Sequence, residues 1–182
     1  YGINLLPLAT FAMEAYGDDP CALFMPKTKF ADNAMDEKTT RLIAQMHKAI
    51  TIIQFKLEGE IIRRRPEFEM DDRMLLHHID LKRGVVHIDG KDYTLKDTNW
   101  PTLDPKDPYR LSIEEEDLIR KILHSFESSE KMKKHMRCFF RHGGMYQVCN
   151  SNLLFHASIP MNPDGTFKSV RILGQDYKGR AL

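Results

Sequence analysis

A long stripe of apolar residues between positions 35 and 65 constrains the fold more than any other feature of this chain. The stripe recurs at intervals of three and four residues, as on one face of an α-helix, and its members are Leu42, Met46, Ile50, Ile53, Leu57 and Ile61. Asp32 or Asn33 is available as a cap at the start, and Pro66 ends the pattern. A helix of about 30 residues is roughly 45 Å long. We therefore expect it to cross a whole small domain, with the other elements packed around it.

Two shorter segments also have a helical pattern. Residues 4–16 carry apolar side chains at intervals of three and four and are followed by Gly17, which favours a short helix that ends there. Residues 71–79 are expected to form a second short helix, with Asp71 or Asp72 as its cap.

A further pair of helices is predicted before residue 143. Ser112 and Glu115 form the capping-box pattern, in which each side chain binds a backbone N–H of the other residue. Ser128 and Ser129 are expected to separate this helix from a second, basic helix that ends at the glycines 143–144. The basic face is explained by exposure to solvent, so it is not interpreted as a nucleic-acid site.

The clearest local β signal is the dipeptide Asp89-Gly90. It lies between the β-prone runs 85–88 and 91–95. Asp-Gly is a preferred sequence for a tight type I′ turn, in which both central residues have positive φ. We therefore expect a β-hairpin at 85–95.

The last quarter of the chain changes from helical to β patterns. Strands are predicted at 145–149 and 153–156, separated by an Asn-Ser-Asn turn, and a further short extended segment at 170–173. The predicted class is therefore α+β. A mainly helical insertion or cap is expected over 1–143, and a β segment that belongs to a larger sandwich is expected over 144–182.

Composition narrows the cellular setting. Lysine and arginine total 27 against 26 acidic residues, a formal net charge of +1, which gives no bulk attraction to nucleic acid. The sequence contains no run of 18 apolar residues, the pattern that would predict a membrane span. The chain has an odd number of cysteines without a C-x-x-C pair, which favours a reducing cytoplasm; they are Cys21, Cys138 and Cys149. The absence of an initiator methionine suggests an internal fragment.

One histidine stands at the end of an apolar run. Residues 152–155 lead to His156, and Pro160 follows shortly after. A buried strand with this pattern would hold an imidazole rigidly at the edge of a sheet, as a metal ligand requires. The alternative is a structural histidine that binds a backbone carbonyl, and a single histidine has no ligand spacing that separates the two.

Several segments in the same order resemble the class III fructose-1,6-bisphosphatases of bacteria. They are YGINLLPL at 1–8, IQFKLE at 53–58, IIRRRP at 61–66, SEK at 129–131 with HM at 135–136, and NLLFH at 152–156 with IP at 159–160. The resemblance implies a calcineurin-like metallophosphoesterase with a dinuclear metal centre, usually manganese, and a sugar bisphosphate as substrate in gluconeogenesis. It assigns His156 as a metal ligand. The family's other ligand motifs have no match here, so the resemblance places no catalytic residue in this chain and implies that the chain alone is inactive.

Three consecutive arginines, Arg63, Arg64 and Arg65, are the candidate substrate-binding residues. Guanidinium groups suit phosphate oxygens, and the implied substrate carries two phosphates. Cations at a helix C-terminus also complement the helix dipole without any ligand. The competing hypothesis for the whole chain is an interaction or regulatory module, in which the long helix supports a homo-oligomer and the chain has no chemistry of its own.

Overall fold

The computed structural model describes residues 1–27, 35–144, 146–156 and 158–182. These form two compact units, residues 1–129 and 130–182, and each unit is described by itself. The boundary predicted at 143–144 concerns the domains of a longer protein and stays a prediction.

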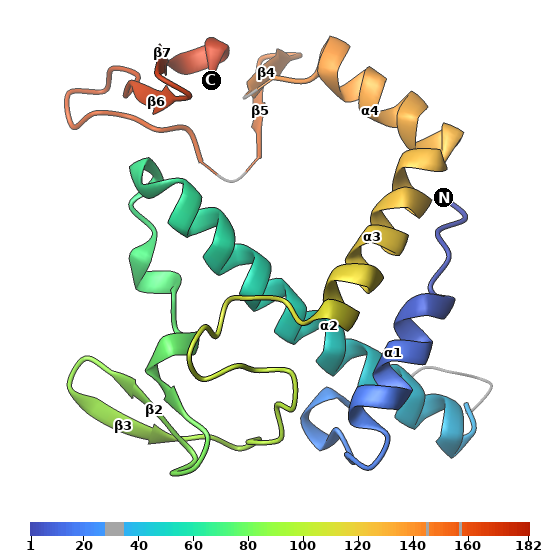
Figure 1. Cartoon of the computed structure of the whole chain (residues 1–182). Coiled ribbons are helices and arrows are strands. Elements are labelled where there is room, and N and C mark those ends of the chain that lie inside the picture. Colours follow the sequence, from blue (N-terminus) through green and yellow to red (C-terminus); the bar gives the residue numbers. More distant parts are fainter. Residues whose placement is uncertain (28–34, 145, 157) are drawn as a thin grey trace. The chain divides into compact units, whose positions relative to one another are not determined.

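Helix α2, Glu37–Arg64, is the axis of the first unit (Figure 1). Its N-cap is Asp36, whose carboxylate accepts a hydrogen bond from the backbone N–H of Thr39 at 2.9 Å. The predicted caps, Asp32 and Asn33, lie outside the described residues, and Asp36, which was not predicted, caps the helix instead. The helix ends two residues before Pro66, which cannot continue it. The long helix predicted from the apolar stripe is confirmed.

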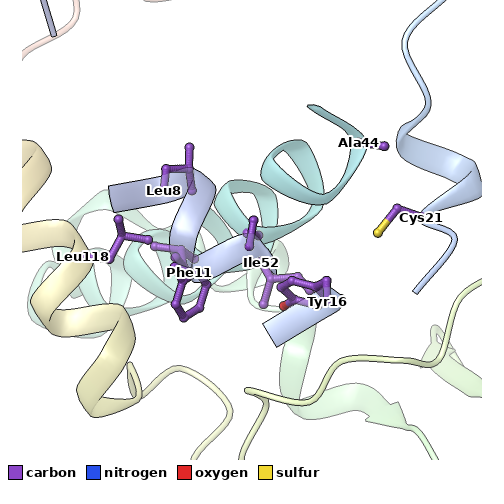
Figure 2. Packing of buried hydrophobic residues seen from close by; sticks show 10 residues of the cluster. Leu8, Phe11, Tyr16, Cys21, Ala44, Ile52 and Leu118 are labelled. Carbon is purple, nitrogen blue, oxygen red and sulfur yellow. The ribbon is translucent and has the colours of Figure 1, made fainter. Parts of the chain in front are cut away.

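The main core lies where α1, Leu6–Tyr16, and α3, Ile113–Ser128, pack together with α2. Figure 2 shows side chains from all three helices and from the loop after α1 pointing into this core. The buried members are Leu8, Phe11, Ala12, Tyr16, Cys21, Ala44, Ala49, Ile52, Ile53 and Leu118. The capping box predicted at Ser112 is present, with both of its hydrogen bonds. Burial of these side chains is the main stabilising contribution to the first unit.

A small antiparallel sheet completes the first unit. Strand β1, Ile79–Asp80, pairs with β2, Val85–Ile88, which pairs with β3, Lys91–Thr94. Asp89 and Gly90 join β2 to β3 with φ of 49° and 76°, the two positive values that a type I′ turn needs. The predicted hairpin is confirmed.

The short helix predicted at 71–79 is wrong. Two separate 3₁₀ turns, Asp71–Arg73 and Leu76–His78, occupy this stretch and lead directly into β1. The backbone N–H of Leu76 donates to the hydroxyl of Tyr109 at 3.1 Å rather than to a carbonyl one helical turn earlier. A contact from 33 residues away therefore takes the donor that a continuous helix would have used.

In its described residues, the second unit has one α-helix, two hairpins and a short 3₁₀ turn at Gly179–Ala181. Helix α4, Glu130–His142, is followed by β4, Tyr146–Cys149, and β5, Asn152–Phe155, which pair antiparallel through a turn whose residues Asn150 and Ser151 have positive φ. Strands β6, Val170–Ile172, and β7, Gln175–Tyr177, form the other hairpin. Position 145, the predicted first residue of β4, lies outside the described residues. Four α-helices with small antiparallel sheets among the described residues confirm the α+β class.

Candidate functional site

Strand β5 ends at Phe155 and delivers His156 directly after it. Phe155 is in register with Tyr146 on β4. The ring of Tyr146 stacks on that of Phe167, with centroids 6.3 Å apart and an interplanar angle of 17°. The strand pair and the aromatic contact therefore hold the backbone that leads to His156.

The strand that carries His156 is not buried, in contrast to the prediction. Leu153, Leu154 and Phe155 are each 53% exposed, and His156 is exposed as well. Within the described part of the chain, β5 pairs with β4 alone. A two-stranded ribbon cannot bury an apolar face without a further layer of structure. The apolar side chains of β5 are therefore not buried by the other described residues.

A pocket of about 400 Å³ opens beside His156 within the second unit. Its wall has polar side chains and the two glycines after α4, and the lining residues are His142, Gly143, Gly144, Tyr146, Gln147, Leu154, Phe155, His156 and Arg180. The ionisable groups of this wall are thus two imidazoles, the guanidinium of Arg180 and the phenol of Tyr146. Such a lining suits an anion or a ligand with hydrogen-bond acceptors.

The donor set around His156 does not make a manganese site by itself. Among the residues that the structure describes, no group of three or more His, Cys, Asp or Glu side chains is placed to hold a metal ion. Manganese favours carboxylate and other oxygen ligands, and the pocket wall contains no carboxylate. His156 can therefore contribute one ligand at most, and the remaining ligands would have to come from other residues.

The three arginines lie at the end of α2, and Arg63 already has several partners. Its guanidinium pairs with Glu60 at 2.9 Å and with Asp107 at 3.0 Å, and it lies over the ring of Tyr109 at 4.6 Å from the centroid. Burial works to lower the pKa of Arg63, but the bonds to Asp107 and Glu60 outweigh it and raise the pKa. Arg63 therefore holds the loop with Asp107 and Tyr109 against the helix.

The two following arginines are engaged less fully. Nε of Arg64 donates to the backbone carbonyl of Glu60 at 3.2 Å, and Arg65 pairs with Glu67 at 3.4 Å. No ion pair with Arg64 is present within the described ranges. The structure brings the three side chains to one helix end but gives them different partners, and their contact with phosphate stays a prediction.

Two buried lysines on α2 were missed at the level of the sequence. Lys48 Nζ pairs with Asp19 at 2.5 Å and with Asp97 at 2.7 Å. Lys56 Nζ pairs with Glu115 at 2.6 Å and donates to the carbonyl of Thr102, also at 2.6 Å. The available signal was their spacing, because both lie four residues from the buried Ile52, on the same helix face.

These lysines connect distant segments to α2. Lys48 joins the loop after α1 to the segment that follows the hairpin, and Asn99 adds a hydrogen bond to Asp19 at 2.7 Å. Burial works against the charge of Asp19, but the bonds from Lys48, the Cys21 amide and Asn99 outweigh it and lower its pKa. Because their charges are paired, we assign both lysines a structural role.

Comparison with known proteins identifies relatives along the whole chain. Residues 1–182 match the family described as Firmicute fructose-1,6-bisphosphatase. The chain is 66% identical over 182 residues to the class 3 fructose-1,6-bisphosphatase of Bacteroides fragilis, and 56% identical over 182 residues to that of Clostridioides difficile. Each match covers 100% of this chain but 27% of the relative, so the chain spans about a quarter of the curated proteins that it matches. No solved structure matches. In the described residues, no helix has the length and apolar character of a membrane span.

Proposed function

The chain belongs to the Firmicute fructose-1,6-bisphosphatase family, and from this we propose that the intact protein hydrolyses the 1-phosphate of fructose 1,6-bisphosphate. The observation that carries the proposal is the family match over residues 1–182, together with 66% identity to a class 3 enzyme along the full length of this chain. We place the reaction in gluconeogenesis and in the cytoplasm. The three free cysteines agree with a reducing compartment.

His156 is proposed as a ligand of a dinuclear manganese centre in the intact protein. Support comes from its place at the end of β5, where its imidazole faces a polar pocket. Such a centre, when bound, polarises a phosphate oxygen and supplies a hydroxide nucleophile. The ligands that this chain lacks would come from the rest of the intact protein, as part of a metallophosphoesterase core.

The chain by itself is then expected to be inactive, because His156 alone cannot hold such a centre. The test compares the 182-residue chain with the intact protein in manganese content and in turnover of fructose 1,6-bisphosphate. Hydrolysis by the isolated chain at the rate of the intact protein would contradict this proposal.

His156→Ala in the intact protein tests the ligand itself. Loss of an outer-shell partner of a metal ligand costs about 10–100-fold in metal affinity or activity. Loss of a ligand should cost at least as much in both quantities. His124→Ala, a change at an exposed histidine of α3, is the matched control and should leave both unchanged. Normal manganese content and turnover in His156→Ala would exclude the assignment.

A second candidate function, assembly of the protein through its helical part, is favoured by apolar side chains on α4. Phe139 is 67% exposed and Phe140 is 85% exposed. Large apolar side chains grouped on a surface are typical of an interface. Replacing both by serine in the intact protein should lower its mass in solution by light scattering if this surface joins subunits. An unchanged mass would show that this surface does not join subunits.

A further inference from the structure

We propose that Arg180 binds the phosphate group that lies next to His156 in the intact enzyme. The identity of the substrate rests on the proposed function, whereas binding of phosphate by Arg180 can be measured without turnover. Neither the arginine run on α2 nor the motif around His156 points to this residue, which is 24 positions further along the chain.

The pocket beside His156 carries the inference. Arg180 and His156 line the same wall, with His142 and Gln147 as further polar side chains. No aspartate or glutamate lines this pocket. Among the described residues, no carboxylate pairs with Arg180, and its guanidinium is exposed. A planar guanidinium without an acidic partner, in a pocket without carboxylates, matches the charge and geometry of a phosphate.

The backbone under Arg180 is held in place by a close contact. Gly179 is buried and has φ of +56°, and a Cβ added there would lie 2.9 Å from Cδ2 of Phe167. Only glycine allows this approach without displacement of the ring or of the backbone. Gly179 also begins the short turn Gly179–Ala181, in which the amide of Leu182 donates to its carbonyl at 3.3 Å.

The same contact connects Arg180 to His156. Phe167, which packs on Gly179, stacks on Tyr146. Tyr146 is in register with Phe155, the residue before His156. A continuous series of packed residues therefore joins the backbone of Arg180 to that of His156. A binding group on such a support is pre-organised, so little conformational entropy is lost when phosphate binds.

The role assigned to Arg180 is binding and orientation. Its guanidinium would donate two parallel N–H bonds to phosphate oxygens in the pocket that His156 also lines. Lysine carries the same charge but not the planar pair of donors, so Arg180→Lys is expected to recover only part of the binding.

The test uses the intact protein with Arg180→Ala, Arg180→Lys and the control Arg171→Ala. Arg171 is an exposed arginine of β6 in the same unit and does not line the pocket. Two readouts are taken: the inhibition constant of inorganic phosphate against fructose 1,6-bisphosphate, and the rise in melting temperature that inorganic phosphate produces. Manganese content is measured for every variant.

Arg180→Ala should raise the inhibition constant of inorganic phosphate about tenfold or more, as expected for loss of a charged hydrogen bond. It should also abolish most of the thermal shift, while manganese content stays at the wild-type value. Arg180→Lys should lie between, and Arg171→Ala should match the wild type. Should Arg180→Ala fail to fold, Arg180→Gln, which keeps most of the side-chain length, carries the same test.

An unchanged inhibition constant and an unchanged thermal shift in Arg180→Ala would overturn the inference. A fall in manganese content that parallels the loss of phosphate binding would also overturn it, because the effect would then act through the metal. If the intact wild-type protein does not hydrolyse fructose 1,6-bisphosphate, the proposed function fails. The thermal shift with inorganic phosphate still decides the role of Arg180 in that case.

Discussion

The ring of Tyr109 lies directly against the backbone of Gly59 near the C-terminal end of α2. A Cβ added at Gly59 would lie 2.0 Å from Cδ1 of that ring, so no larger residue fits without moving the ring. The hydroxyl of Tyr109 accepts a hydrogen bond from the backbone N–H of Leu76 at 3.1 Å and lies 2.9 Å from Nδ1 of His77. The close approach at Gly59 thus fixes the turns that lead into the hairpin.

Gly59→Ala is expected to destabilise the first unit. An alanine in place of glycine should favour a helix by about 0.5–1 kcal/mol, but overpacking against the ring costs about 1–3 kcal/mol. The net loss should appear as faster hydrogen exchange in peptides of α2 in the intact protein. Gly144→Ala is the control, because the nearest atom to its added Cβ is 3.7 Å away. Stronger protection of α2 in Gly59→Ala would refute the contact.

Lys56→Met should be strongly destabilising because it leaves Glu115 buried without its cation. Both side chains are fully buried, and removal of one partner of such a pair costs about 3–5 kcal/mol. Glu115→Gln keeps the capping pattern at Ser112 and removes only the charge. The double variant should lose less than the sum of the single losses, measured by hydrogen exchange of α2 and α3. Strict additivity would mean that the two charges are not coupled.

Tyr16 is expected to resist ionisation. Burial raises its pKa from 10.0 to about 12 in the folded protein. Because the folded-state pKa lies above that of an unfolded tyrosine, the neutral phenol contributes stability that is fully present below pH 10 and is lost as the pH rises toward 12. Absorbance at 295 nm, which follows tyrosine ionisation, should therefore show a late transition in the wild type that is missing in Tyr16→Phe. A wild-type titration curve identical to that of Tyr16→Phe between pH 10 and 12 would contradict the burial effect.

Of the three arginines at the end of α2, we expect Arg64 to be the one that contacts phosphate. Arg63 is engaged by Asp107, Glu60 and Tyr109, whereas Arg64 meets only a backbone carbonyl within the described residues. Arg64→Ala in the intact enzyme should raise KM for fructose 1,6-bisphosphate about tenfold, as for loss of a charged hydrogen bond, with kcat nearly unchanged.

Arg63→Ala serves as the comparison for Arg64→Ala. It should leave KM unchanged and reduce hydrogen-exchange protection of the turn at Leu76–His78, which Tyr109 holds. A rise in KM for Arg63→Ala alone would show that Arg63, and not Arg64, contacts the phosphate. An unchanged KM for both variants would leave the arginines with a purely structural role.

Short-range patterns predicted most of the elements correctly. Ser112 and Glu115 mark the start of α3 because both capping bonds form within four residues. Asp89 and Gly90 mark the hairpin because their own backbone conformations make the turn. The helix predicted at 71–79 failed because the amide of Leu76 binds Tyr109, which no local pattern includes.

The buried charges show the same limit of sequence patterns. Lys48 and Lys56 count as polar positions in any helical pattern, so exposure is the natural expectation for both. Their partners Asp19, Asp97 and Glu115 are 29, 49 and 59 positions away. Burial became favourable only after the chain path had brought these carboxylates to the helix.

The sequence by itself determined the elements whose signals are local: the length of α2, the capping box at Ser112, the hairpin turn and the place of His156 after an apolar strand. Only the tertiary structure decided which distant groups meet, as Tyr109 meets Gly59 and Arg180 shares a pocket with His156. The physical reason is the range of the interactions. Caps and turns form between residues a few positions apart, whereas these contacts require the chain to return over many residues before any energy is gained.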